Sequence, residues 1–119
     1  MEMPVTVYFN PKCSKSRAAR DLLDGRGIDY QLIEYLDAPL DLATLEDILQ
    51  RLGNEDPRTI LRSKEAVYRD LKLDEADRAA LLTAIIQHPI LLERPIVLAG
   101  TRGVVARPPE RLLELFETE

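Results

Sequence analysis

The chain has 119 residues, the size of a single domain with its own hydrophobic core. Its net charge of -5 at pH 7 argues against a general electrostatic attraction to nucleic acid or to an anionic membrane. A single cysteine excludes an internal disulfide, and one cysteine with one histidine argues against a zinc site. We therefore expect one domain over residues 1–119, without a metal.

The N-terminus lacks a basic segment followed by an apolar run, so we expect no signal peptide. No apolar stretch reaches the roughly 18 residues that a membrane-spanning helix needs. The most apolar run, residues 84–100, is interrupted by polar and charged side chains. These features favour a cytoplasmic protein, which we expect to be a monomer.

The first half of the chain begins with a strand at residues 5–9, because its β-branched and aromatic side chains indicate burial on both faces. A helix follows from about Ser14, with apolar residues at helical spacing, and two glycines end it at residues 25–27. Residues 30–35 predict a second strand. Strand, helix and strand then form a right-handed parallel unit.

The middle of the chain is predicted to be helical. Asp41 is suited to cap a helix whose apolar face ends at Gly53. Further helical segments are predicted at residues 57–61, 64–71 and 74–88.

The last third predicts two strands, at residues 96–99 and 104–106, joined by a turn. Pro108 then begins a final helix. The order β-α-β, helical insertion, β-β-α is that of a thioredoxin-like α/β fold. Its core is expected at about residues 4–37 and 94–117, with a helical lobe at about residues 38–92.

The one cysteine, Cys13, follows a turn at Asn10 and stands where the first helix begins. The unpaired N–H groups and the positive dipole end of a helix stabilise a thiolate at that position. Lys12, Lys15 and Arg17 add positive charge nearby. Two interpretations stay open at this point, a reactive thiolate beside an anion site and a buried structural thiol.

Ser16 occupies the position of the second cysteine in the redox motif Cys-x-x-Cys. A serine does not resolve a mixed disulfide, but it can donate a hydrogen bond to a thiolate or to a bound oxyanion. Arg62, Arg94 and Arg107 each stand at the edge of an element, and a guanidinium suits a tetrahedral oxyanion. Their spacing alone does not distinguish them from solvated surface arginines. His88, at a helix end, is interpreted as structural.

Several motifs occur together: Asn-Pro-x-Cys within residues 8–17, His-Pro-Ile-Leu at residues 88–91 and Arg-Pro-Ile-Val at residues 94–97. With residues 60–62 and 107–110, they resemble the glutaredoxin-coupled arsenate reductases of the ArsC family, which have a thioredoxin-like fold. The resemblance covers nearly the whole chain in the family's order.

The resemblance implies that Cys13 is the nucleophile and that Arg62, Arg94 and Arg107 line an oxyanion site. It also implies a cis peptide bond before Pro95. Supporting positions within the matched motif are Asn10, Lys12, Ser16 and Arg17.

The implied activity is the reduction of arsenate to arsenite. The Cys13 thiolate attacks arsenate and displaces water, glutathione attacks the adduct and reduces arsenic, and glutaredoxin removes the glutathione. Glutathione is thus a co-substrate, and no bound cofactor is expected. Characterised reductases carry a histidine before Asn-Pro, whereas this chain has Phe9, which would raise a nearby thiol pKa by desolvation. Our hypothesis is that Lys12 compensates.

Two other functions stay open. One is a related glutathione-dependent thiol reductase with a different substrate, which needs the thiol but not the histidine. The other is a regulator that binds RNA polymerase, because some family members sense oxidation through Cys-x-x-Cys. Ser16 removes that switch here.

Overall fold

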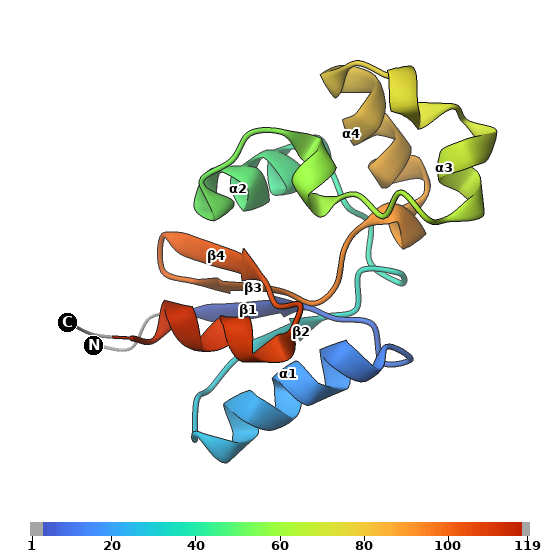
Figure 1. Ribbon diagram of the computed structural model, residues 1–119. Coiled ribbons are helices and arrows are strands. Elements are labelled where there is room, and N and C mark those ends of the chain that lie inside the picture. Colours follow the sequence, from blue (N-terminus) through green and yellow to red (C-terminus); the bar gives the residue numbers. More distant parts are fainter. Residues whose placement is uncertain (1–3, 118–119) are drawn as a thin grey trace.

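The computed structural model describes residues 4–117, which form a four-stranded sheet in the order β2-β1-β3-β4 (Figure 1). β1 runs parallel to β2 and antiparallel to β3, and β3 forms a hairpin with β4. Residues 1–3, where no signal peptide is predicted, and residues 118–119 lie outside the described part of the chain. The strands are β1 (Val5–Tyr8), β2 (Gln31–Ile33), β3 (Ile96–Ala99) and β4 (Arg102–Val105).

Helices cover both faces of the sheet (Figure 1). α1 and the 3₁₀ helix η4 lie on one face, and α2 lies on the other, with α3 and α4 beyond it. This is the predicted thioredoxin-like order of elements, whereas the predicted boundaries between core and lobe stay a prediction. The α-helices are α1 (Ser14–Gly25), α2 (Leu42–Leu52), α3 (Ala66–Asp70) and α4 (Arg78–Gln87), and the 3₁₀ helices are η1 (Pro57–Ile60), η2 (Leu73–Glu75), η3 (Pro89–Leu91) and η4 (Pro109–Leu115).

The ends of α2 follow directly from its local sequence. The Asp41 carboxylate accepts a hydrogen bond from the Thr44 N–H at 2.8 Å and begins the helix. Gly53, with a φ of 75°, ends it in the left-handed conformation that glycine adopts without strain. Both residues have the roles predicted for them.

The helix predicted to begin at Asp74 begins four residues later. Asp77 is its cap, because its carboxylate accepts a hydrogen bond from the Ala80 N–H at 2.9 Å. Residues 73–75 form the separate turn η2, after Lys72 at a φ of 56°. Ala76 and Asp77 have extended backbone conformations between η2 and α4, so these two helical segments do not join.

Strand pairing sets the bounds of two strands that differ from the prediction, and two predicted helices also differ. The second strand, predicted at residues 30–35, is limited to the three residues that pair with β1. The fourth strand begins at Arg102 rather than at residue 104, because Arg102 already pairs with Ala99. The weaker helix predicted at residues 64–71 is shortened to α3, and the final helix is of the 3₁₀ type.

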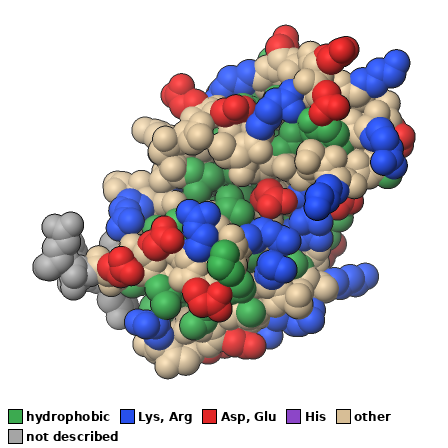
Figure 2. Space-filling model, viewed as in Figure 1, with side chains coloured by type: hydrophobic (Ala, Val, Ile, Leu, Met, Phe, Trp, Pro, Cys, Tyr) green, Lys and Arg blue, Asp and Glu red, His purple; other side chains and the backbone are tan. Residues whose placement is uncertain are grey.

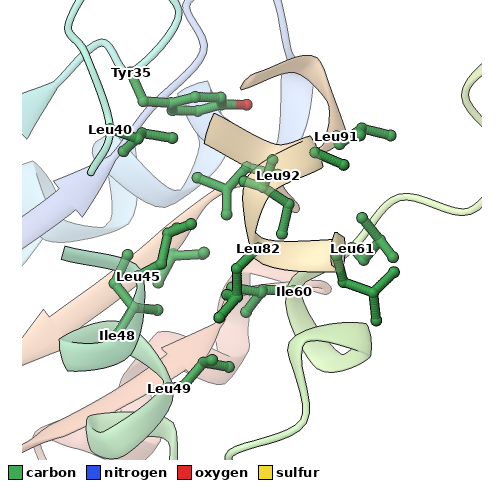
Figure 3. Close-up of a cluster of buried hydrophobic side chains, with 14 of the residues drawn as sticks. Tyr35, Leu40, Leu45, Ile48, Leu49, Ile60, Leu61, Leu82, Leu91 and Leu92 are labelled. Carbon is green, nitrogen blue, oxygen red and sulfur yellow. The ribbon is translucent and has the colours of Figure 1, made fainter. Parts of the chain in front are cut away.

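The hydrophobic core lies on both faces of the sheet. Val7 and Phe9 belong to the cluster beneath α1 and η4, whereas Tyr8 belongs to the cluster beneath α2 and α4. β1 is therefore buried on both faces, as predicted. Figure 3 shows the second cluster, in which Tyr35 and Leu40 lie near leucine and isoleucine side chains of the helical segments. Within residues 4–117, no helix is both long enough and apolar enough to cross a membrane.

Candidate active site

Cys13 lies at the junction between β1 and α1, where it is the residue directly before the helix. Hydrogen bonds within the turn hold it there. Its N–H donates to the Asn10 carbonyl oxygen at 3.0 Å, and the Lys12 N–H donates to Asn10 Oδ1 at 3.0 Å. The Asn10 N–H in turn donates to Ser16 Oγ at 3.3 Å. Asn10 and Ser16 are both buried, so they fix the thiol, which is partly exposed, on a rigid support.

The environment of Cys13 favours its thiolate. Burial by itself raises the pKa of the thiol, but hydrogen bonds to the sulfur outweigh this effect. They come from the N–H and the hydroxyl of Ser16, from the Arg94 side chain and from the N–H of Lys15. Together these groups lower the pKa of Cys13 from 9.0 to about 7. About half of the molecules therefore carry a thiolate at neutral pH.

The charged residues on either side of Cys13 have different surroundings. Arg17 Nη1 donates to the carbonyl oxygen of Pro11 at 2.9 Å, so its guanidinium closes the turn. The Lys12 side chain is exposed, and the groups with the largest effect on the Cys13 pKa are Ser16, Arg94 and Lys15 instead. The hypothesis that Lys12 compensates for the missing histidine therefore gains no support from this geometry.

Phe9 is a core residue, and an effect of its ring on the pKa of the Cys13 thiol stays a prediction. Its side chain is only 2% exposed and belongs to the cluster with Ala19 and Leu23 of α1. The Arg20 guanidinium carbon lies 5.4 Å from the centre of its ring, in a cation–π arrangement. In the arsenate reductases that this chain resembles, a histidine is expected at this position. Here the position contributes to packing.

Arg94 stands at the entrance to β3, beside the thiol. The peptide bond between Arg94 and Pro95 is cis, as the resemblance implies, and so is the bond before Pro108, which the sequence did not indicate. Nε and Nη1 of Arg94 are buried, and neither has a hydrogen-bond partner among the described residues. Buried guanidinium nitrogens are normally paired, so this arrangement is suited to an anion supplied from outside.

Backbone hydrogen bonds bring Arg62 to the same place from a distant part of the chain. The Arg62 N–H donates to the Leu91 carbonyl oxygen at 2.7 Å, and the Glu93 N–H donates to the Ile60 carbonyl oxygen at 2.8 Å. Residues 60–62 therefore run alongside residues 91–93. Arg107 joins them because its Nη1 donates to the Arg94 carbonyl oxygen at 2.9 Å.

Arg62 and Arg107 share a carboxylate that the sequence analysis did not single out. Arg62 Nη1 lies 3.5 Å from Glu93 Oε1, and Arg107 Nε lies 3.6 Å from Glu93 Oε2. A second carboxylate, Glu65, lies 3.0 Å from Arg62 Nε. The three predicted arginines are thus gathered, but two of them are paired with Glu93. In the sequence, the one signal of this ion pairing was that an acidic residue, Glu93, stands directly before Arg94.

A pocket of about 290 Å³ opens between these side chains and the segment that follows Arg62. Figure 2 shows lysine and arginine side chains gathered near the middle of this face, with an acidic side chain among them. The pocket therefore has the charge and size to receive a small anion. It is lined by Leu61, Arg62, Ser63, Lys64, Glu93 and Arg107.

Known proteins resemble this chain over nearly its whole length. Residues 8–115 match the model of the ArsC family. A protein of Neisseria meningitidis named arsenate reductase is 48% identical over 110 residues, which cover 91% of this chain and 94% of that protein. Escherichia coli YfgD, named an uncharacterized protein, is 41% identical over 117 residues, covering 97% of this chain and 98% of that protein.

Among solved structures, one titled arsenate reductase from Vibrio cholerae superimposes with a TM-score of 0.92 at 40% identity, and the match covers 97% of this chain and 99% of that chain. The thiol after the first strand and the arginines beside it therefore lie in a fold shared over nearly its whole length. On the matched family model and these similarities, the chain belongs to the ArsC family.

Proposed function

We propose that this protein is an arsenate reductase with Cys13 as its nucleophile. The observation that carries the proposal is a thiol whose pKa is lowered to about 7, next to an arginine with two buried nitrogens that have no partner within residues 4–117. A thiolate beside donors for an oxyanion is the arrangement that nucleophilic attack on an anionic centre requires. The names of the relatives from Neisseria meningitidis and Vibrio cholerae support arsenate as that anion.

The first step is attack of the Cys13 thiolate on arsenic. A sulfur–arsenic bond forms, an arsenic–oxygen bond breaks, and the oxygen leaves as water after taking up protons. Arsenic remains pentavalent in this adduct. Arg94 stabilises the negative charge on the remaining oxygens, because two of its nitrogens have no acceptor in the described part of the chain.

The second step brings electrons from other molecules, because the chain has one cysteine. The thiolate of glutathione attacks the sulfur of Cys13 and forms a disulfide. The sulfur–arsenic bond breaks, its electron pair stays on arsenic, and trivalent arsenite leaves. Glutaredoxin then takes up the glutathione by thiol exchange and returns Cys13 as a thiolate. A free thiol of this kind belongs to a reducing compartment, so we also propose a cytoplasmic location.

A coupled assay tests this function. Arsenate-dependent oxidation of NADPH is followed with glutathione, glutaredoxin and glutathione reductase present, for the wild type and for Cys13→Ser. We expect turnover by the wild type and none by the variant. Equal turnover by both proteins would exclude the mechanism, and omission of glutaredoxin or glutathione in turn tests each co-reactant.

The pairing of Glu93 with two arginines favours a second candidate function. A carboxylate at that place reduces the positive charge available to an oxyanion. A glutathione-dependent thiol reductase acting on a small mixed disulfide needs the Cys13 thiolate but not the free charge of Arg62 and Arg107. Reduction of a glutathione mixed disulfide by the wild type, without any response to arsenate, would favour this alternative.

A further inference from the structure

Tyr35 is a buried phenol that the proposed mechanism does not use. Its side chain has no exposed surface, and its hydroxyl oxygen has no hydrogen-bond partner within residues 4–117. In Figure 3 its ring lies beside Leu40 at one side of the hydrophobic cluster, and the hydroxyl points away from Leu40. Buried tyrosine hydroxyls normally find a partner, because an unmade hydrogen bond in the interior is unfavourable.

The surroundings of this hydroxyl are those of the candidate active site. The groups whose charges act on Tyr35 are Arg94, Arg62, Cys13 and Glu93. The strand register places the phenol there as well, because Tyr8 pairs with Ile33, two residues before Tyr35, and with Ile96, two residues after Arg94. The two buried nitrogens of Arg94 also lack a partner in the described part of the chain. The Tyr35 hydroxyl and the two Arg94 nitrogens can each donate a hydrogen bond. One acceptor with several oxygens would therefore satisfy all three.

We propose that Tyr35 is a substrate-binding residue whose O–H donates a hydrogen bond to an oxygen of the oxyanion held between Cys13 and Arg94. This inference rests on the proposed function, since it adds a neutral donor to the same oxyanion site. A neutral donor complements the guanidinium of Arg94, because it orients an oxygen of the anion without requiring a further carboxylate to balance its charge.

The chemistry of Tyr35 fits a neutral hydrogen-bond donor. Burial raises the pKa of Tyr35 to about 12, although the positive charges of Arg94 and Arg62 lower it in part. The phenol therefore keeps its proton over the pH range in which Cys13 becomes a thiolate. It is therefore a neutral hydrogen-bond donor whether Cys13 is a thiol or a thiolate.

Removal of the hydroxyl alone tests the proposal. Tyr35→Phe keeps the ring that packs beside Leu40. An effect on arsenate binding can therefore be distinguished from an effect on folding. The measurement is the rate of Cys13 alkylation by iodoacetamide at increasing arsenate, with ionic strength held constant by chloride. We expect the arsenate concentration that gives half protection to rise about tenfold, the loss typical of a hydrogen bond to a charged group. Without arsenate, the pH dependence of alkylation should stay unchanged.

The melting temperature of Tyr35→Phe without arsenate supplies a second readout. Arsenate binding should weaken in this variant, whereas its stability should not fall. Loss of a hydroxyl that has no partner among the described residues should leave the melting temperature unchanged or raise it. Tyr68→Phe is the matched control, because the Tyr68 hydroxyl donates to Asp74 Oδ1 at 2.7 Å and accepts from Arg58 Nη1 at 2.8 Å. That variant should lose stability and keep its protection by arsenate.

The possible outcomes separate this inference from the proposed function. Equal protection of the wild type and Tyr35→Phe would overturn the role of Tyr35 alone. A lower melting temperature of arsenate-free Tyr35→Phe would also overturn it, because the hydroxyl would then have a partner within the protein. If arsenate fails to protect even the wild type, the oxyanion site and the role of Tyr35 are both refuted.

Discussion

Glu93 pairs with Arg107 across the candidate pocket, with 3.6 Å between Oε2 and Nε. The other oxygen of the same carboxylate lies 3.5 Å from Nη1 of Arg62. The protein thus holds an anion of its own between two of the arginines that the family resemblance assigns to oxyanion binding. An incoming oxyanion has to compete with this carboxylate or displace it.

Substitution of Glu93 by glutamine should strengthen oxyanion binding. The amide keeps the shape and removes the charge, so Arg62 and Arg107 become available to arsenate. A partly exposed ion pair is worth up to ~1 kcal/mol, so the arsenate concentration for half protection of Cys13 should fall about fivefold. Glu65→Gln is the comparison variant and should lower this concentration by less, because Glu65 contacts Arg62 alone among these arginines. Weaker binding by Glu93→Gln would show instead that the carboxylate positions the arginines.

Loss of the Ser16 hydroxyl should make Cys13 less reactive at neutral pH. The hydroxyl is one of the donors that lower the pKa of Cys13 to about 7, so Ser16→Ala should raise that pKa. A rise of about one unit would reduce the thiolate fraction at pH 7 from about a half to about a tenth. The ultraviolet absorbance of the thiolate, followed against pH, gives the pKa directly.

Ser14→Ala is the matched control for this measurement. Ser14 is the first residue of α1 and is exposed, and it is not among the main groups that act on the Cys13 pKa. Its removal should leave the titration curve unchanged. Equal shifts in the two variants would assign the lowered pKa to the helix end as a whole and not to the Ser16 hydroxyl.

Arg94 and Lys12 should differ in their effect on the thiol. Arg94→Ala removes a hydrogen-bond donor to the sulfur and should raise the pKa of Cys13. Lys12→Ala should leave it unchanged, because the Lys12 side chain is exposed and other groups dominate the shift. The rate of alkylation against pH measures both variants. A clear rise of the pKa in Lys12→Ala would restore the hypothesis that Lys12 compensates for the absent histidine.

Arg58 should matter for stability and not for the reactivity of the thiol. Its Nη2 donates to the carbonyl oxygens of Leu73 and Asp74 at 2.8 and 3.1 Å, and its Nη1 donates to the Tyr68 hydroxyl. Arg58→Ala leaves these acceptors unpaired, so the free energy of unfolding in urea should fall by about 1–2 kcal/mol. The alkylation rate of Cys13 in the folded protein should not change. Arg69→Ala, on the exposed side of α3, should have little effect on either quantity.

Local sequence was sufficient for the junction that carries the thiol. An apolar β-branched strand, an Asn-Pro turn and a helix start are features of neighbouring residues, so they predict where Cys13 lies and why its thiolate is favoured. The same holds for Asp41 and Gly53, which act on backbone groups within their own helix. Short-range hydrogen bonds and backbone preferences determine all of these elements.

The surroundings of the thiol depended on tertiary structure. The backbone pairing of residues 60–62 with residues 91–93 places Arg62 beside Glu93, and no local pattern encodes a pairing at that separation. Strand pairing also brings the segment of the buried Tyr35 to the edge of the sheet where Arg94 stands, although in the sequence Tyr35 only closes a predicted strand. By itself, then, the sequence determined the position of the one thiol and the order of elements. Tertiary structure decided which charges and donors face that thiol, because electrostatic and hydrogen-bond partners are set by distance in space and not by position along the chain.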